Sequence, residues 1–213
     1  MNKQGAAAFV ATGALALALA GCGGGDDAPE VTPAATQAAA EASPAATADP
    51  TEAAPSTGTR EAPLAPGESR QVGSDSAWTV SLVSSNLDAA AAIQAADPYG
   101  PQPADGEAFV VGTFSVTVSG DQIAAQGSDL ANEGADPGQS LTVTYVAADG
   151  TSYDGASGSM CYTQNMLYSQ GAVFQDGAVV TGDQCVAVPV DKVPGGLWRV
   201  SNIVNDSVWF SAS

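Results

Sequence analysis

The sequence contains no histidine. Histidine is the usual general base near neutral pH and the commonest metal ligand in proteins. Its absence excludes serine–histidine and cysteine–histidine catalysis and histidine-based zinc sites. No other catalytic set and no cofactor motif is present, so we expect a protein that is not an enzyme and carries no cofactor.

Basic residues are also scarce. The chain of 213 residues has 5 lysines and arginines against 23 aspartates and glutamates, which gives a net charge of −18 at pH 7. Such a surface repels the phosphate backbone of nucleic acids, so nucleic acid is excluded as a partner. The acidic surplus favours a soluble monomer.

Acidic residues are the abundant chemical group. Asp149, Asp154 and Asp176 could supply oxygens to calcium, which takes six or more such ligands. The chain has no EF-hand spacing, and each of these aspartates precedes or lies near a glycine, a pattern typical of turns. We therefore predict no metal site and keep calcium as an alternative. A carboxylate pair for glycoside hydrolysis is less favoured, because the aromatic and basic groups that line a sugar cleft are few.

One long apolar run is present, and it lies at the N-terminus. Residues 6–20 are apolar except at Thr12 and Gly13, and Lys3 precedes them. The run is too short for a comfortable membrane span and has the proportions of a secretory signal peptide.

The apolar run ends in Leu19-Ala20-Gly21-Cys22. This motif resembles the bacterial lipobox, which implies diacylglycerol on the sulfur of Cys22 and cleavage after Gly21. Two or three acyl chains suffice for stable anchoring. We therefore predict a signal peptide over residues 1–21 and a lipid anchor on the outer face of the cell membrane. The alternative is an ordinary secretory signal cut elsewhere.

The segment that follows is poor in large apolar residues. Residues 22–68 consist mainly of Ala, Pro, Thr, Ser, Gly and acidic residues. Such a composition cannot bury enough surface to offset its ordering entropy. We predict a disordered tether, whose length suits a spacer through a thick cell wall and favours a Gram-positive source.

Cysteine is used only three times. With Cys22 assigned to the anchor, Cys161 and Cys185 remain. In an exported protein two remaining cysteines indicate a disulfide, which would stabilise the fold by roughly 3 kcal/mol. Two buried free thiols are the alternative.

Residues 69–213 alternate short apolar runs with turn residues, which predicts about seven strands in an all-β sandwich. The predicted strands are 78–82, 109–118, 141–145, 184–190, 197–204 and 207–211. Residues 86–96 are predicted as a short helix or an irregular crossover. Pro189 predicts an edge strand or a strand end, and Asn205-Asp206 a tight hairpin turn.

Alternation within these runs predicts which side chains face the core. In the longest run, Thr113, Ser115 and Thr117 are predicted to face outward. The residues predicted to face inward are Trp78, Val80, Leu82, Val110, Phe114, Val116, Val118, Val186, Val188 and Val190.

Several of these runs together resemble a known family. They are Trp-Thr-Val at 78–80, Glu-Ala-Phe-Val-Val-Gly-Thr-Phe-Ser-Val-Thr-Val at 107–118, Ala-Ala-Asp-Gly-Thr-Ser-Tyr at 147–153, Cys-Val-Ala-Val-Pro at 185–189 and Val-Trp-Phe at 208–210. The order is similar to the immunoglobulin-like domain of unknown function on Gram-positive lipoproteins, related to the mycobacterial immunoprotective extracellular antigen. The resemblance implies an immunoglobulin-like antiparallel β-sandwich and brings no catalytic residues. The chain departs from the family at Ser119-Gly120-Asp121, where an asparagine is common. No tryptophan lies between the two cysteines, so it is not a true immunoglobulin domain.

Large side chains cluster in sequence around the two cysteines. They are Tyr153, Met160, Tyr162, Met166, Tyr168 and Phe174. Large apolar side chains are mostly core, so we predict that they are buried over the disulfide. An exposed aromatic binding patch is the alternative.

The tether and the scarcity of reactive groups favour a surface interaction module. Such a module would bind another exported protein or a wall polymer through loops or an edge strand. A small-ligand or calcium-binding lipoprotein is the alternative, and a hydrolase is the least favoured.

Overall fold

The computed structural model describes residues 57–213. The signal peptide, Cys22 and the tether up to residue 56 lie outside the described residues. None of the helices within 57–213 is both long and apolar enough to cross a membrane.

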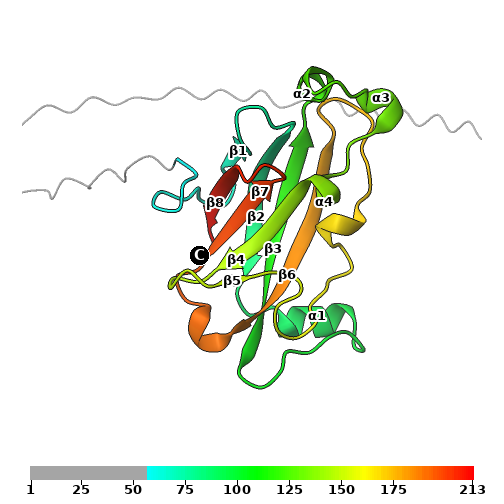
Figure 1. The fold of residues 1–213 in the computed structure, drawn as a ribbon. Coiled ribbons are helices and arrows are strands. Elements are labelled where there is room, and N and C mark those ends of the chain that lie inside the picture. Colours follow the sequence, from blue (N-terminus) through cyan, green and yellow to red (C-terminus); the bar gives the residue numbers. More distant parts are fainter. Residues whose placement is uncertain (1–56) are drawn as a thin grey trace, which may run out of the picture. The chain divides into compact units, whose positions relative to one another are not determined.

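Eight strands in the described part of the chain form two four-stranded antiparallel sheets (Figure 1). The first sheet has the order β1 (Ser69–Gln71), β2 (Trp78–Asn86), β3 (Glu107–Val118), β6 (Val179–Pro189). The second has the order β5 (Ser152–Tyr153), β4 (Leu141–Val146), β7 (Leu197–Asn202), β8 (Ser207–Ser211). The prediction of an all-β sandwich is confirmed.

The main core lies between the two sheets and contains the apolar face of each long strand. In β3 the inward residues are fully buried, while Thr113, Ser115 and Thr117 are only half-buried, as predicted. The prediction for Val190 is wrong, because its side chain is 54% exposed. β6 ends at Pro189, which has no N–H for the ladder, and the chain turns into the 3-10 helix η2 (Val190–Lys192). β6 is also an edge strand, so both predictions for Pro189 hold.

Aromatic rings fill the centre of this core. Phe114 meets Trp198 edge-to-face with ring centroids 5.6 Å apart, and Phe210 lies 6.2 Å from the same phenylalanine. Each such pair is worth about 0.5–1.5 kcal/mol beyond area burial. Gly112 makes room for them, since a Cβ there would lie 2.7 Å from the Phe114 ring and 2.8 Å from the Trp198 ring.

Short helices and turns connect the strands. The helix predicted within residues 86–96 is present as α1 (Ala90–Ala96). Sequence reasoning missed α2 (Gly120–Ala125), α3 (Leu130–Glu133), α4 (Pro137–Ser140) and η1 (Leu167–Ser169). The three α-helices among these begin after capping side chains, Ser119, Asp129 and Asp136. The predicted hairpin between β7 and β8 is present, but β7 ends at Asn202 and not at residue 204, so the connection spans residues 203–206 and is longer than the predicted two-residue turn. Asn205 within it has a φ of 68°.

The predicted boundary between tether and domain at residue 69 is wrong. Residues 57–64, hereafter the arm, run beside β8 and bond to its backbone. Trp209 N donates to Gly58 O at 3.0 Å, Leu64 N to Trp209 O at 2.9 Å, and Ser211 N to Leu64 O at 2.8 Å. Leu64 is 3% exposed and belongs to the main core. The arm thus covers a strand edge that would otherwise expose unpaired backbone groups.

Candidate functional site

The disulfide between Cys161 and Cys185 lies on the outer face of the first sheet. The two Cα atoms are 5.4 Å apart, and the pairing agrees with the prediction. Val186 and Val188 of β6 face the main core, so Cys185 and Ala187 face the other way. The bridge therefore fastens the loop before η1 onto β6, and it does not connect the two sheets.

A second hydrophobic cluster surrounds this disulfide. It consists of Ala89, Ile93, Phe109, Cys161, Met166, Cys185 and Ala187. Phe109 faces outward on β3 and is nevertheless fully buried, because α1 and the disulfide cover it. The outer face of β3 and β6 is thus partly closed by a small core of its own.

The prediction that the aromatic cluster is buried over the disulfide is wrong. Met160, Tyr168 and Phe174 are more than half exposed, and Tyr162 is 37% exposed. Only Met166 is fully buried, and Tyr153 is half-buried. The disulfide packs instead with Phe109, Ile93 and Met166 in the second cluster.

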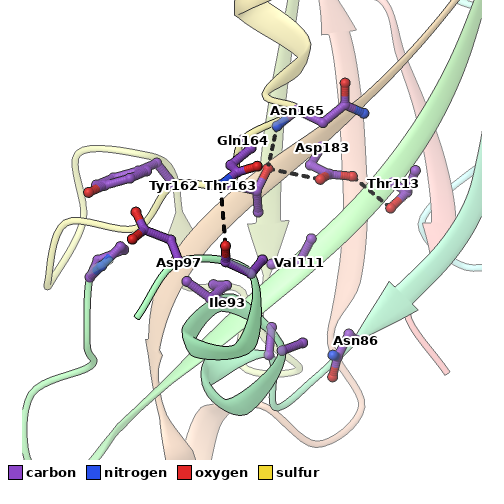
Figure 2. A pocket seen from close by; sticks show the side chains of 14 residues that line it. Asn86, Ile93, Asp97, Val111, Thr113, Tyr162, Thr163, Gln164, Asn165 and Asp183 are labelled. Atoms are coloured by element: carbon purple, nitrogen blue, oxygen red, sulfur yellow. Dashed lines mark hydrogen bonds between the residues drawn. The ribbon is translucent and has the colours of Figure 1, made fainter. Parts of the chain in front are cut away.

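A pocket with a volume of about 370 Å³ opens beside this second cluster. It lies between α1, the outer face of β3 and β6, and residues 162–165, as Figure 2 shows. Its apolar wall consists of Ala89, Ala92, Ile93, Ala96 and Val111. Alanine favours helix formation, and its small side chain leaves the space of the pocket unfilled.

The polar end of the pocket is organised around Asp183. Thr113 Oγ1 donates to its Oδ1 at 2.8 Å, and Thr163 Oγ1 donates to its Oδ2 at 2.8 Å (Figure 2). Thr113 lies directly opposite Asp183 in the register of β3 and β6. Asn165 ties the loop to the strand, since its carbonyl accepts from Asp183 N at 2.7 Å and its N–H donates to Thr163 Oγ1 at 3.3 Å. The carboxylate is therefore held from both sides.

The charge of the pocket has one sign. Asp97 and Asp183 are its ionisable carboxylates, and no lysine or arginine lines it. Each oxygen of Asp183 accepts one hydroxyl bond and keeps capacity for a second donor. The pocket therefore disfavours anions and suits a neutral or cationic group next to a small apolar body.

α1 is fixed at both ends, which gives the pocket a defined wall. Ala89 N donates to Phe109 O at 2.8 Å, and Gln164 Nε2 donates to Ala96 O at 3.4 Å. Beyond the helix, Gln94 Nε2 donates to Gly100 O and Pro101 O at 3.1 and 3.0 Å. One backbone bond and the side chains of two glutamines therefore hold this wall, in addition to the second cluster.

The three aspartates considered for calcium each have a separate local partner. Asp149 pairs with Lys192 at 2.7 Å, and this hydrogen bond lowers the pKa of the Asp149 carboxyl to about 2. Asp154 accepts from Ala156 N and Ser157 Oγ, and Asp176 accepts from Gly120 N at 2.7 Å. Within residues 57–213 no three acidic or cysteine side chains meet in a group that could hold a metal ion.

Of the residues that line the pocket, the sequence singled out Tyr162 as part of a possible binding patch but did not indicate Asp183 or Thr163. Thr113 was placed on the correct face, but Asp183 fell just outside the strand predicted from residue 184. Asp183 lies directly opposite the outward-facing Thr113 in the register of β3 and β6. This pairing would have indicated the polar end of the pocket, but it can be recognised only when the strand register is known.

No protein-family model and no curated protein matches the chain. Among solved structures, the chain is similar to a conserved hypothetical protein from Bacillus anthracis, whose crystal structure was determined at 2.2 Å. The two share 12% identity over 69% of this chain and 94% of that chain, with a TM-score of 0.39. This similarity is too weak to carry an argument about fold type or function.

Proposed function

We propose that this chain is an exported lipoprotein whose immunoglobulin-like sandwich is a binding module for a small amphipathic cation. The lipobox-like motif at Cys22 supports the anchor on the outer face of the membrane. The two antiparallel sheets support the immunoglobulin-like type, although the disulfide lies outside the sandwich and does not join the sheets. The pocket makes the proposed function more specific than that of a general surface interaction module, because it offers a site for a small ligand.

The observation that carries the proposal is the placement of Asp183 at the end of an apolar pocket that no basic side chain lines. The two threonine hydroxyls orient the carboxylate. An ammonium group can bind it, while a short hydrocarbon body contacts Ile93, Val111 and the alanines of α1. The pocket volume lies at the lower end of the range of about 300–1,000 Å³ for small-molecule sites.

Binding of matched small molecules tests the ligand class. The mature chain is titrated with alkyl and aryl amines and with carboxylates of the same carbon skeleton, and binding is followed by ligand-observed NMR. We expect the amines to bind and the carboxylates not to bind. Asp183→Asn removes the charge at nearly constant shape and should abolish the preference. Asp121→Asn, an exposed position in α2, is the matched control.

Equal binding of amines and carboxylates, or an unchanged preference in Asp183→Asn, would contradict the cation assignment. A response of the Asp121→Asn control equal to that of Asp183→Asn would show that only the overall charge matters.

The anchor has its own test. Cys22→Ala should move the protein from the membrane fraction to the culture medium of the expressing cells. A Cys22→Ala chain that stays with the membrane would overturn the anchoring proposal without touching the pocket.

A further inference from the structure

Basic side chains are distributed unevenly over the described part of the chain. Residues 57–213 contain four, and one of them, Lys192, forms the single ion pair of this part with Asp149. The other three, Arg60, Arg70 and Arg199, gather around the arm and β8. The side chain of Arg70 passes next to Gly58, since a Cβ there would lie 3.0 Å from Arg70 Cδ.

Two of these arginines stack on one tryptophan. The Cζ atoms of Arg60 and Arg199 lie 5.8 and 5.9 Å from the centroid of the Trp209 ring. Trp209 is half-buried and points to the outer face of the second sheet, because its neighbours Val208 and Phe210 face the core. The cluster of Arg60, Arg199 and Trp209 is hereafter called the arginine–tryptophan cluster.

The cluster is held by backbone contacts on each side. Arg199 in β7 lies directly opposite Trp209 in the strand register, and its Nε donates to Ser207 Oγ at 3.1 Å. The arm brings Arg60 into place, because Gly58 and Leu64 bond to the N–H and the carbonyl of Trp209. The backbone bonds of the arm place the Cα of Arg60 beside β8, and the bond to Ser207 orients the guanidinium of Arg199 before any ligand binds.

The terminal guanidinium nitrogens are left available. Neither Arg60 nor Arg199 forms an ion pair within residues 57–213, although acidic residues outnumber basic ones there by far. A guanidinium that stacks on an aromatic ring keeps its N–H donors at the edge of its plane. Those donors match the paired oxygens of a phosphate or carboxylate group.

We propose that the arginine–tryptophan cluster is a binding site for a single phosphate group on a small ligand. The two guanidinium groups supply charged donors, and the tryptophan supplies the ring against which both lie. A small ligand fits better than an extended anionic polymer or a membrane surface, because the strongly acidic remainder of the domain repels an extended anion. The site lies on the second sheet and is separate from the Asp183 pocket.

Intrinsic fluorescence gives a direct readout. Trp78 and Trp198 are 5% and 0% exposed, so collisional quenching by acrylamide reports mainly on Trp209. The mature chain is titrated with inorganic phosphate and with phenyl phosphate, and phosphorus NMR line width serves as a second measurement. We expect saturable binding of both probes together with a change in quenching.

Charge-matched variants separate a specific site from general electrostatics. Arg60→Gln and Arg199→Gln should each weaken phosphate binding by at least about tenfold, because a bidentate charge-assisted contact is lost. Lys192→Gln changes the net charge equally and should leave the affinity within about twofold. Arg199→Lys keeps the charge but loses the planar guanidinium that stacks on Trp209 and binds phosphate in a bidentate way, so it should bind phosphate more weakly than wild type and more tightly than Arg199→Gln.

Three outcomes would overturn the proposal. The first is equal binding by the wild-type chain, Arg60→Gln and Arg199→Gln, which would leave the arginines as clamps for the arm. The second is an equal loss in Lys192→Gln. The third is binding of long-chain polyphosphate without binding of the small probes, which would assign the cluster to an extended anionic polymer.

Discussion

The two outer faces of the sandwich differ in charge and in how each is built. On the first sheet, outward residues of β3 and β6 form a pocket with carboxylates and no cations. On the second sheet, outward residues of β7 and β8 present two arginines around Trp209. Both faces rest on the same alternating strands, whose inward residues form a common core. The charge of each face therefore depends on its outward residues and on the segments that pack over them.

The attachments are of two kinds. A disulfide and a buried helix face hold the pocket, whereas backbone hydrogen bonds of the arm and one leucine hold Arg60 against β8. Perturbing one attachment should therefore damage one face and leave the other intact.

Loss of the disulfide should have the largest effect. The cysteines are 24 residues apart, and opening that loop costs roughly 3 kcal/mol of unfolding free energy in the chain-entropy model. The double variant Cys161→Ser/Cys185→Ser should show this decrease in denaturant titrations and should lose amine binding at the pocket. Phosphate binding at the arginine–tryptophan cluster should persist below the unfolding transition. If both binding activities disappear together while the chain is still folded, the two faces are not independent.

Truncating Leu64, the core residue of the arm, should lower stability somewhat less than loss of the disulfide does. It should weaken phosphate binding and leave amine binding unchanged. Leu64→Ala removes a 3% exposed side chain and should cost about 2 kcal/mol of unfolding free energy, because the site lies near the edge of the core. Phosphate binding should weaken as Arg60 loses its place, and amine binding should stay unchanged. Ile203→Ala, which truncates an 83% exposed side chain, is the control and should change neither.

Removing one hydroxyl from the pocket should have a modest effect. Thr113→Val keeps the shape of the side chain and leaves Oδ1 of Asp183 without its donor, at a cost of about 1 kcal/mol. Amine affinity should change while the melting temperature falls by a few degrees. Thr117→Val, on the same strand and face, is the matched control. An equal response of both variants would place the effect in the strand and not in the pocket.

Much of the sandwich could be predicted from the sequence, because burial imposes an alternating pattern on each strand. Trp78, Phe114 and Val186 were assigned to the core for this reason, and Pro189 to a strand end. The pattern failed at Val190 because alternation does not show where a strand stops. The prediction of the tether had a different basis, its composition. Composition does not show that Leu64, the single leucine of that segment, enters the core.

The candidate sites were harder to predict, because they depend on contacts between distant segments. Phe109 looks like an outward residue by alternation, and only the packing of α1 shows that it is buried. The same packing leaves Tyr162 and Tyr168 exposed, contrary to the prediction. Asp183 and Thr113 are 70 residues apart, and the cluster at Trp209 joins the arm to the last hairpin. Such pairs become visible only once the strand register is known.

The smallest predicted effect concerns the ion pair of Asp149 and Lys192, which belongs to neither face. The hydrogen bond from Lys192 lowers the Asp149 pKa to about 2, below its value in an unfolded chain of about 3.9. A group whose pKa is lowered by folding stabilises the folded state above the unfolded-state pKa, and this contribution is lost as the pH falls through the folded-state value. Asp149→Asn should therefore lower the melting temperature slightly at neutral pH, because the pair is exposed and screened by solvent. The difference between variant and wild type should shrink between pH 4 and pH 2, and amine and phosphate binding at neutral pH should be unchanged. A difference that persists undiminished at pH 2 would show that the effect does not come from the charge of Asp149, because the bonds from Lys192 and from Thr151 N both favour the charged carboxylate.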